Sequence, residues 1–249
     1  MAGASSSSSS SSSNPKASFE TFFEGWLVRQ EHFLEELQSV VETCEESRHE
    51  DLEELSDRVL SHYKQYYEEK SRMCSRNVFL VFNPTWFTPF ERTFFWIAGF
   101  KPDLALRVVS VAAGDLTPEQ NQSIEKLKKE MRVVEKELSA ELARVQESVA
   151  APELMVVGGR APVDGEIGNI DGVLEEIRAD MVAVLSNADV LRTRTAERLV
   201  GILNPVQKVK FLAAATQLQT CSFGLGRLGY RGKQETGREI NNLLSGFYL

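Results

Sequence analysis

The stretch FNPTWFTPFERTFFWIAGFKP, residues 82–102, decides the fold of this chain, because it gathers eight of the 22 aromatic residues into 21 positions. So many aromatic side chains have to pack against other parts of the protein. The sequence Thr-Pro-Phe-Glu that begins at Thr88 supplies a capping hydroxyl, a proline for the first helical position and a glutamate at the third. Gly99 suits a left-handed position at the end of a helix, and Pro102 could start the next helix. We therefore predict a buried helix of about ten residues that begins at Pro89.

Two long helices are predicted before this aromatic stretch. Apolar residues recur at steps of three and four from about Phe19 to Cys44, which gives one apolar stripe along a helix. The same pattern from Leu52 predicts a second helix that runs to about Lys70. The polar residues 47–50 between them form the expected bend.

A further long helix is predicted after the aromatic stretch. Thr117 and Pro118 repeat the capping pattern, with Gln120 at the third helical position, and an apolar stripe follows from Ile124 to Val149. The stripe holds little more than two regular heptads, so we favour packing inside the domain over dimerisation as a zipper. The glycines and prolines of residues 150–169 predict a loop or flexible linker.

The remainder of the chain continues the helical pattern. Apolar periodicity predicts one helix over 170–185 and another over 190–203. Asn204 and Pro205 end the second of these and cap a last helix, and the glycine-rich tail from Phe223 should be irregular. No convincing strand pattern is present, so the predicted fold class is all-α, a bundle-like single domain.

The expected domain organisation has three parts. The first 17 residues include nine consecutive serines and cannot bury enough apolar surface to become ordered. The helical domain follows over residues 18–220, and a largely irregular Gly- and Arg-containing tail covers residues 221–249.

The net charge of −8 hides an uneven distribution of charge. Residues 20–70 contain 15 acidic and 5 basic residues, whereas residues 192–238 contain 9 basic and 2 acidic residues. We favour docking of the two regions on one another, or simple solvation, over phosphate binding. The alternative nucleic-acid patch would consist of Arg192, Arg194, Arg198, Lys208 and Lys210.

The sequence provides no support for secretion, membrane insertion or catalysis. Three widely spaced cysteines, Cys44, Cys74 and Cys221, argue for core or half-buried thiols in a reducing compartment, so cytosol or nucleus is expected. The three histidines lack the spacing of a metal site, and we interpret them as surface residues. No nucleophile, metal, cofactor or phosphate-loop motif is found, so we predict a protein that is not an enzyme and needs no cofactor. An apolar-ligand or haem-binding regulator is the alternative if the aromatic stretch lines a pocket.

Several segments together carry a resemblance to a known family. The residues that carry it, which could serve the fold or a partner surface, are Phe22, Trp26, Gln30, Trp86, Pro89, Glu91, Arg92, Trp96, Gly99, Pro102, Gln146 and Arg192. With these signature residues the chain resembles the plant Delay of Germination domain, which is related to the C-terminal domain of TGA-type basic-zipper transcription factors. The resemblance spans roughly residues 18–220 and includes the aromatic stretch.

The resemblance implies a helical regulatory protein of plants. It implies protein partners such as type 2C protein phosphatases or transcriptional coactivators, and a role in seed dormancy and abscisic acid signalling in the nucleus, the cytoplasm or both. A serine tract stands where a TGA factor carries its basic helix and zipper, which makes the free-standing family type the closer match and direct DNA binding doubtful.

Overall fold

The structure is a computed structural model that describes residues 15–85, 87, 92, 95–149 and 166–224. Within these residues every regular element is a helix, which confirms the predicted all-α class. The helices are α1 (Pro15–Thr43), α2 (His49–Arg76), α3 (Val78–Phe82), α5 (Asp103–Ala112), α6 (Pro118–Val149), α8 (Glu166–Ile202) and α9 (Pro205–Gly224).

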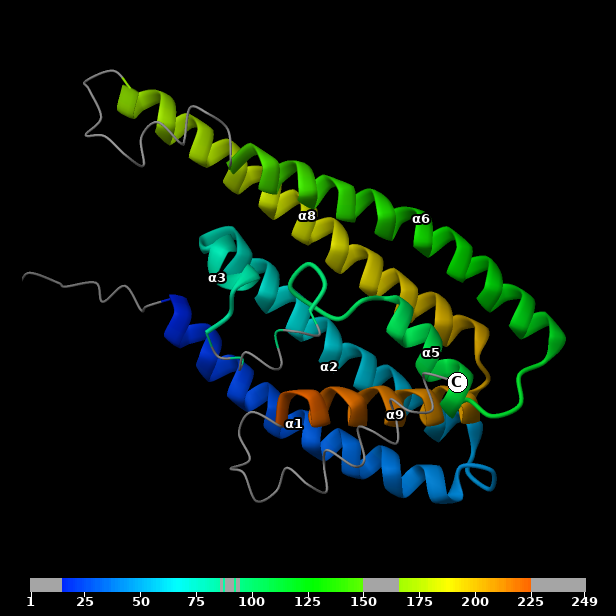
Figure 1. Cartoon of the computed structure of the whole chain (residues 1–249). Coiled ribbons are helices and arrows are strands. Elements are labelled where there is room, and N and C mark those ends of the chain that lie inside the picture. The colour runs from blue at the N-terminus through cyan, green and yellow to red at the C-terminus, as the bar shows by residue number, and fades with distance from the viewer. Residues whose placement is uncertain (1–14, 86, 88–91, 93–94, 150–165, 225–249) are drawn as a thin grey trace, which may run out of the picture.

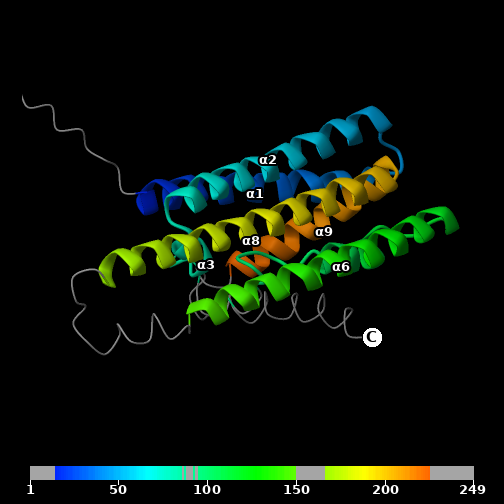
Figure 2. The same ribbon diagram turned by 90° about the horizontal axis from the view of Figure 1, so that it is seen from above.

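The helices form two groups that share a core. In the first, α9 packs against α1, α2 and α5. In the second, α6 lies along α8, and both views place this pair side by side with α6 at the edge of the assembly (Figures 1 and 2). The largest apolar cluster joins α1, α2, α5, α6, α8 and α9 through buried residues such as Leu37, Val59 and Leu199. The apolar stripe of α6 is therefore used inside the domain, as the sequence indicates.

The predicted helix starts have the expected caps. At the start of α6, Gln120 N–H donates to Thr117 Oγ1 over 3.2 Å, and Thr117 N–H donates to Gln120 Oε1 over 3.0 Å. At the start of α9, Gln207 and Asn204 make the same reciprocal pair, at 2.9 and 3.0 Å. Each arrangement satisfies two backbone N–H groups that have no partner inside the helix, so both chain reversals are fixed by local sequence.

Three predictions about helix boundaries were wrong. Residues 170–185 and 190–202 belong to one continuous helix, α8. The helix continues through Ser186 and Asn187 because neither residue type breaks a helix and because the residue that follows them, Ala188, is fully buried. The second wrong prediction concerns the segments expected to be irregular, because α8 begins at Glu166, inside the predicted loop, and α9 continues to Gly224, inside the predicted tail. The rest of that loop, the tail and the serine tract lie outside the described residues.

The third wrong prediction concerns the aromatic stretch. Residues 95–100 are not helical, so the helix expected from Pro89 does not reach Gly99. Pro89 itself lies outside the described residues. The backbone of residues 95–100 instead forms a tight bend, in which Trp96 N–H donates to Gly99 O over 2.6 Å. The next helix does begin beside Pro102, as predicted.

Candidate functional site: the signature loop and the surfaces around it

The loop Phe95–Phe100 carries two signature residues, Trp96 and Gly99, and Arg192 on α8 holds it in place. The guanidinium group donates from Nε to Phe100 O and from Nη2 to Ile97 O, each over 2.8 Å, and it also donates to Trp96 O. Its Cζ lies 5.5 Å from the centre of the Trp96 ring. One buried cation thereby accepts the role that backbone N–H groups have in a helix or a sheet, since it donates hydrogen bonds to three carbonyl groups of a loop without regular secondary structure.

The loop has a strained backbone that this cation stabilises. Ile97 and Ala98 have φ angles of 46° and 54°, a left-handed conformation that costs a β-branched residue most. Both side chains are buried, so packing and hydrogen bonding together hold the strained conformation. The left-handed positions are therefore Ile97 and Ala98, not Gly99 as the sequence suggested.

Gly99 is required for a different reason. A Cβ atom at this position would lie 2.8 Å from Cζ of Arg192, closer than van der Waals contact permits. The glycine thus allows the guanidinium group to approach the loop backbone. Two signature residues that are far apart in sequence, Gly99 and Arg192, are explained by a single contact.

Arg192 belongs to a buried group of three charges. It pairs with Asp189 on the preceding turn of α8, and Asp189 Oδ1 also accepts a bond of 2.8 Å from Lys70 Nζ on α2. Lys70 is 3% exposed, and its burial lowers the pKa of the amine to about 8 despite the carboxylate. Sequence patterns did not identify Lys70 and Asp189 as a pair, because the two residues are 119 positions apart.

The first signature segment builds a second buried network. Trp26 is fully buried, donates from Nε1 to His62 O over 3.0 Å, and stacks on the His62 ring at 4.6 Å. Gln30 donates to Tyr63 Oη over 2.7 Å and to Gln219 Oε1 over 3.1 Å. These bonds join α1 to α2 and α9. Burial raises the pKa of Tyr63 to about 12, so its hydroxyl stays protonated and can hydrogen bond.

His62 corrects one prediction from the sequence. The prediction of surface histidines was wrong for His62, which is 3% exposed, and right for His32 and His49. The reason is that α1 and α9 cover this turn of α2, which sequence periodicity alone did not show. Its Nε2 is buried without a hydrogen-bond partner among the described residues. Burial, together with the positive charge of Arg29, lowers the pKa of His62 to about 4.

The other signature residues fall into different environments. Phe22 is half-buried beside the aromatic cluster of α1, and Pro102 is buried at the start of α5. Arg92 donates to Asn83 Oδ1 over 2.5 Å, whereas Gln146 is exposed on α6. Trp86, Pro89 and Glu91 lie outside the described residues. The signature residues that the structure describes therefore mainly join helices, and these residues do not converge on one solvent-facing site.

The predicted nucleic-acid patch is not gathered on one face. Arg192 is buried, and Arg198 pairs with Glu130 of α6 over 2.6 Å. Lys208 and Lys210 pair with acidic residues of the first half, as described next, and Arg194 is exposed on α8.

The acidic region of residues 20–70 contacts basic residues of α9. Lys208 contacts Glu53 of α2 over 2.7 Å, and Lys210 contacts Glu45, in the turn after α1, over 2.7 Å. These ion pairs support the interpretation of the uneven charge as mutual docking.

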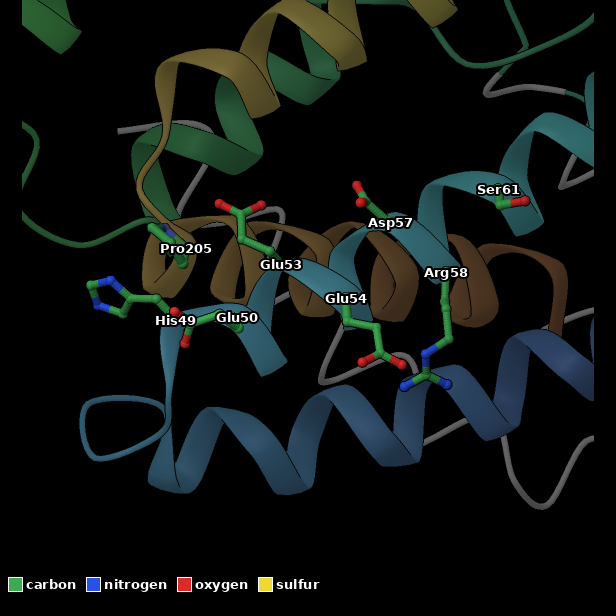
Figure 3. A pocket seen from close by; sticks show the side chains of 8 residues that line it. All are labelled: His49, Glu50, Glu53, Glu54, Asp57, Arg58, Ser61 and Pro205. Atoms are coloured by element: carbon green, nitrogen blue, oxygen red, sulfur yellow. The ribbon is translucent and has the colours of Figure 1, made fainter.

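A shallow concavity lies along the start of α2 (Figure 3). It has a volume of about 740 Å³, and Glu53 and Asp57 project from one side of α2 while Glu54 and Arg58 project towards α1. The side chains diverge and do not converge on one point, and no group of three or more His, Cys, Asp or Glu residues in the described part of the chain could hold a metal ion. This groove therefore has the form of a contact surface.

The aromatic cluster leaves little room for a ligand. Phe19, Tyr66, Lys70 and Phe87 line a cavity of about 10 Å³, which is about the space that one water molecule needs. A haem or a lipid chain would require these rings to separate. Among the described helices, none is long and apolar enough to cross a membrane.

These features define a class: an all-helical scaffold whose most distinctive residues hold the helices together and leave the outer faces for contacts. The sequence profile of the DOG1 family, described as seed dormancy control, matches residues 33–110. Protein RESPONSE TO ABA AND SALT 1 of Arabidopsis thaliana is 38% identical over 210 residues, which cover 81% of this chain and 91% of that protein. Protein ZW2 of Arabidopsis thaliana is 33% identical over 205 residues, which cover 80% of this chain and 91% of that protein. The chain belongs to the DOG1 family, a family of plant regulatory proteins.

The same region is found within longer transcription factors. Transcription factor TGA2.3 of Oryza sativa subsp. japonica is 27% identical over 202 residues, which cover 80% of this chain and 60% of that factor. This match confirms the relationship to TGA factors that the sequence motifs indicate. The similarity places the family in the context of transcriptional regulation.

Proposed function

We propose that this chain is a non-enzymatic regulator that binds protein partners and thereby acts in transcription and abscisic acid signalling during seed dormancy. The observation that carries the proposal is the use of the signature residues. Trp26, Gln30 and Arg192 are buried and hold the helices together, so the family signature maintains a rigid scaffold. A rigid helical scaffold with charged outer faces suits protein recognition.

The relatives support the biological setting. One carries a response to abscisic acid and salt in its name, and another is a transcription factor. By resemblance, the partners include a type 2C protein phosphatase or a transcriptional coactivator, and the place of action is the nucleus, the cytoplasm or both. A fluorescent fusion of the full chain in seed cells tests the location.

The test of the proposed function is a pull-down from developing seed extract with the full chain as bait, read by mass spectrometry. We expect a phosphatase or a coactivator to be enriched over beads that carry no bait. An Asp189→Asn bait, which should lose the buried ion pairs, provides the control for recognition of the folded state. Enrichment of no protein, or equal enrichment by the two baits when the variant is shown to be unfolded, would contradict the proposal.

DNA association has less support from the geometry, because four of the five patch residues are already paired or buried. An electrophoretic shift assay with duplex DNA at low and physiological salt provides the comparison. We expect no shift at physiological salt. Binding that weakens steeply with salt would favour the DNA-associated alternative.

A further inference from the structure

A basic surface with exposed valines lies where α5 meets α6. We define the α5–α6 face as Arg107 and Val111 of α5 together with Lys129, Arg132, Val133 and Lys136 of α6. The two valines are 54% and 58% exposed, which places them among the more exposed large apolar side chains of the described residues. In both views α6 lies at the edge of the helical assembly (Figures 1 and 2).

Hydrogen bonds and ion pairs fix the register of the two helices. The N–H group of Asp103 donates to Glu135 Oε1 over 3.2 Å, and the Asp103 carboxylate lies 3.9 Å from Arg132 Nη2. These contacts place the start of α5 beside the middle of α6. Because the chain turns back between Ala112 and Pro118, α5 then runs antiparallel to α6, and Arg107 comes level with Lys129.

The α6 part of the face carries an excess of positive charge. Residues 126–136 contain five basic and two acidic residues, and both acidic residues are engaged elsewhere. Glu130 pairs with Arg198 of α8, and Glu135 is buried against Lys101 and the start of α5. Lys129 and Lys136 have no ion pair with any described residue. Glu137 is exposed next to Lys136, and the face remains positive with that carboxylate included.

The spacing along α6 places an apolar residue among the cations. Lys129, Val133 and Lys136 follow at steps of four and three, which puts all three on the same side of the helix. A chain of phosphate groups would use the cations but would gain nothing from the valines. A protein segment with carboxylates and an apolar side chain would use both.

We propose that the α5–α6 face binds an acidic segment of a protein partner, whose carboxylates pair with Lys129 and Lys136 while an apolar side chain packs on Val133. The proposal rests on the proposed function, since it names the surface and the chemistry of one partner. Charge complementarity steers the encounter, and the apolar contact selects acidic segments that carry a bulky side chain.

The experiment is a fluorescence anisotropy titration of the full chain against three labelled probes. The first is a peptide that alternates Asp or Glu with Leu and Phe, the second is a polyglutamate peptide of equal charge, and the third is a short DNA duplex. We expect the first probe to bind more tightly than the other two at about 150 mM salt. The double variant Lys129→Glu/Lys136→Glu should weaken its binding about tenfold, and Val133→Ser about threefold.

Matched controls separate this face from general charge and apolarity. Lys64→Glu on α2 changes an exposed lysine, and Val28→Ser on α1 changes a valine that is 54% exposed. Both should leave binding unchanged, and thermal melting should show that all variants fold. The pull-down from seed extract is repeated with the double variant Lys129→Glu/Lys136→Glu as bait. If this variant enriches the same partner as the unchanged chain, this inference fails while the proposed function stands.

Other outcomes would assign the face to another occupant and overturn the proposal. Equal binding of all three probes with no effect of Val133→Ser would indicate a nonspecific cationic surface, and preference for the duplex would indicate a nucleic acid. Self-association that Lys129→Glu abolishes would assign the face to a second copy. Peptide binding that requires removal of residues 225–249 would assign it to the C-terminal segment of the same chain.

Discussion

Arg192 on α8 and Trp96 in the signature loop are joined twice, once by a hydrogen bond from the guanidinium group to Trp96 O and once by the cation–ring contact at 5.5 Å. Trp96 continues the connection to a third element, since its Nε1 donates to Ser139 Oγ of α6 over 3.0 Å. The loop thus links α8 to α6 through one arginine and one tryptophan. This relationship makes the loop a part of the scaffold and predicts how the fold responds to substitution.

Arg192→Ala should lower the free energy of unfolding by about 3–5 kcal/mol, because it leaves three loop carbonyls without their buried donor and removes one of the two cations that pair with Asp189. Arg192→Lys should recover only part of this stability, since one ammonium group cannot reproduce the planar fork. Urea unfolding followed by circular dichroism measures both. Arg194→Ala, two positions away and exposed, is the control and should change stability little. A small effect of Arg192→Ala would show that the loop is held by packing alone.

Substitution of the buried carboxylate Asp189 should cost more stability than substitution of its partner Lys70. Asp189→Asn leaves the Lys70 and Arg192 cations buried without an anion, so we expect a loss of about 3–5 kcal/mol. Lys70→Met leaves the Asp189–Arg192 pair intact and replaces a costly buried amine with an apolar chain, so its effect should lie within about 1 kcal/mol. Denaturant midpoints of the two variants test the order. Equal losses would indicate that both cations are needed to balance the site.

Gly99→Ala should destabilise the protein by about 1–3 kcal/mol, because the added methyl group meets Cζ of Arg192 at 2.8 Å. Gly201 supplies a matched control near the end of α8, where an added Cβ meets nothing within 4 Å. Gly201→Ala should stabilise the helix by about 0.5–1 kcal/mol. Thermal melts of the two single variants should therefore shift in opposite directions. A shift in the same direction would show that the loop can move away from α8.

His62 should make stability fall as the pH drops below its ordinary pKa. Its folded pKa of about 4 lies below the unfolded value of 6.5, so the unfolded state binds more protons in this window. The free energy of unfolding should decrease between about pH 6.5 and pH 4 by up to about 3 kcal/mol from this group. Urea titrations at several pH values measure the slope.

His62→Phe should flatten that pH dependence, because phenylalanine keeps the stacking on Trp26 and cannot take up a proton. His49→Gln, at an exposed position, should leave the slope unchanged. An unchanged slope in His62→Phe would attribute the pH dependence to carboxylates instead.

Much of the fold was predictable because the signals are local. The starts of α6 and α9 depend on residues three positions apart, and the long helices follow from apolar periodicity. The aromatic stretch was harder. Its capping signal, its glycine and its prolines predict one helix. Residues 95–100 form a strained bend instead, because Arg192, which lies 92 positions after Phe100, donates hydrogen bonds to carbonyl groups of this loop.

The structural roles of the candidate residues were harder to predict than the family to which the chain belongs. Trp26, Gln30 and Arg192 could be identified as signature residues by resemblance, yet nothing in the sequence showed that they are buried in networks across α1, α2, α8 and α9. His62 was misjudged for the same reason, since its burial depends on helices that are distant in sequence. The acidic and basic regions could be matched by charge, and the structure showed which residues pair.

The sequence by itself determined the all-α class, most helix starts and the family, because caps, periodicity and motifs are properties of neighbouring residues. Only the tertiary structure decided that the signature loop is bent, that Asp189 is shared by two cations, and that α5 and α6 together present a basic face with exposed valines. The physical reason is that burial, strain and charge pairing depend on which helices meet, and that is settled by the packing of the whole core.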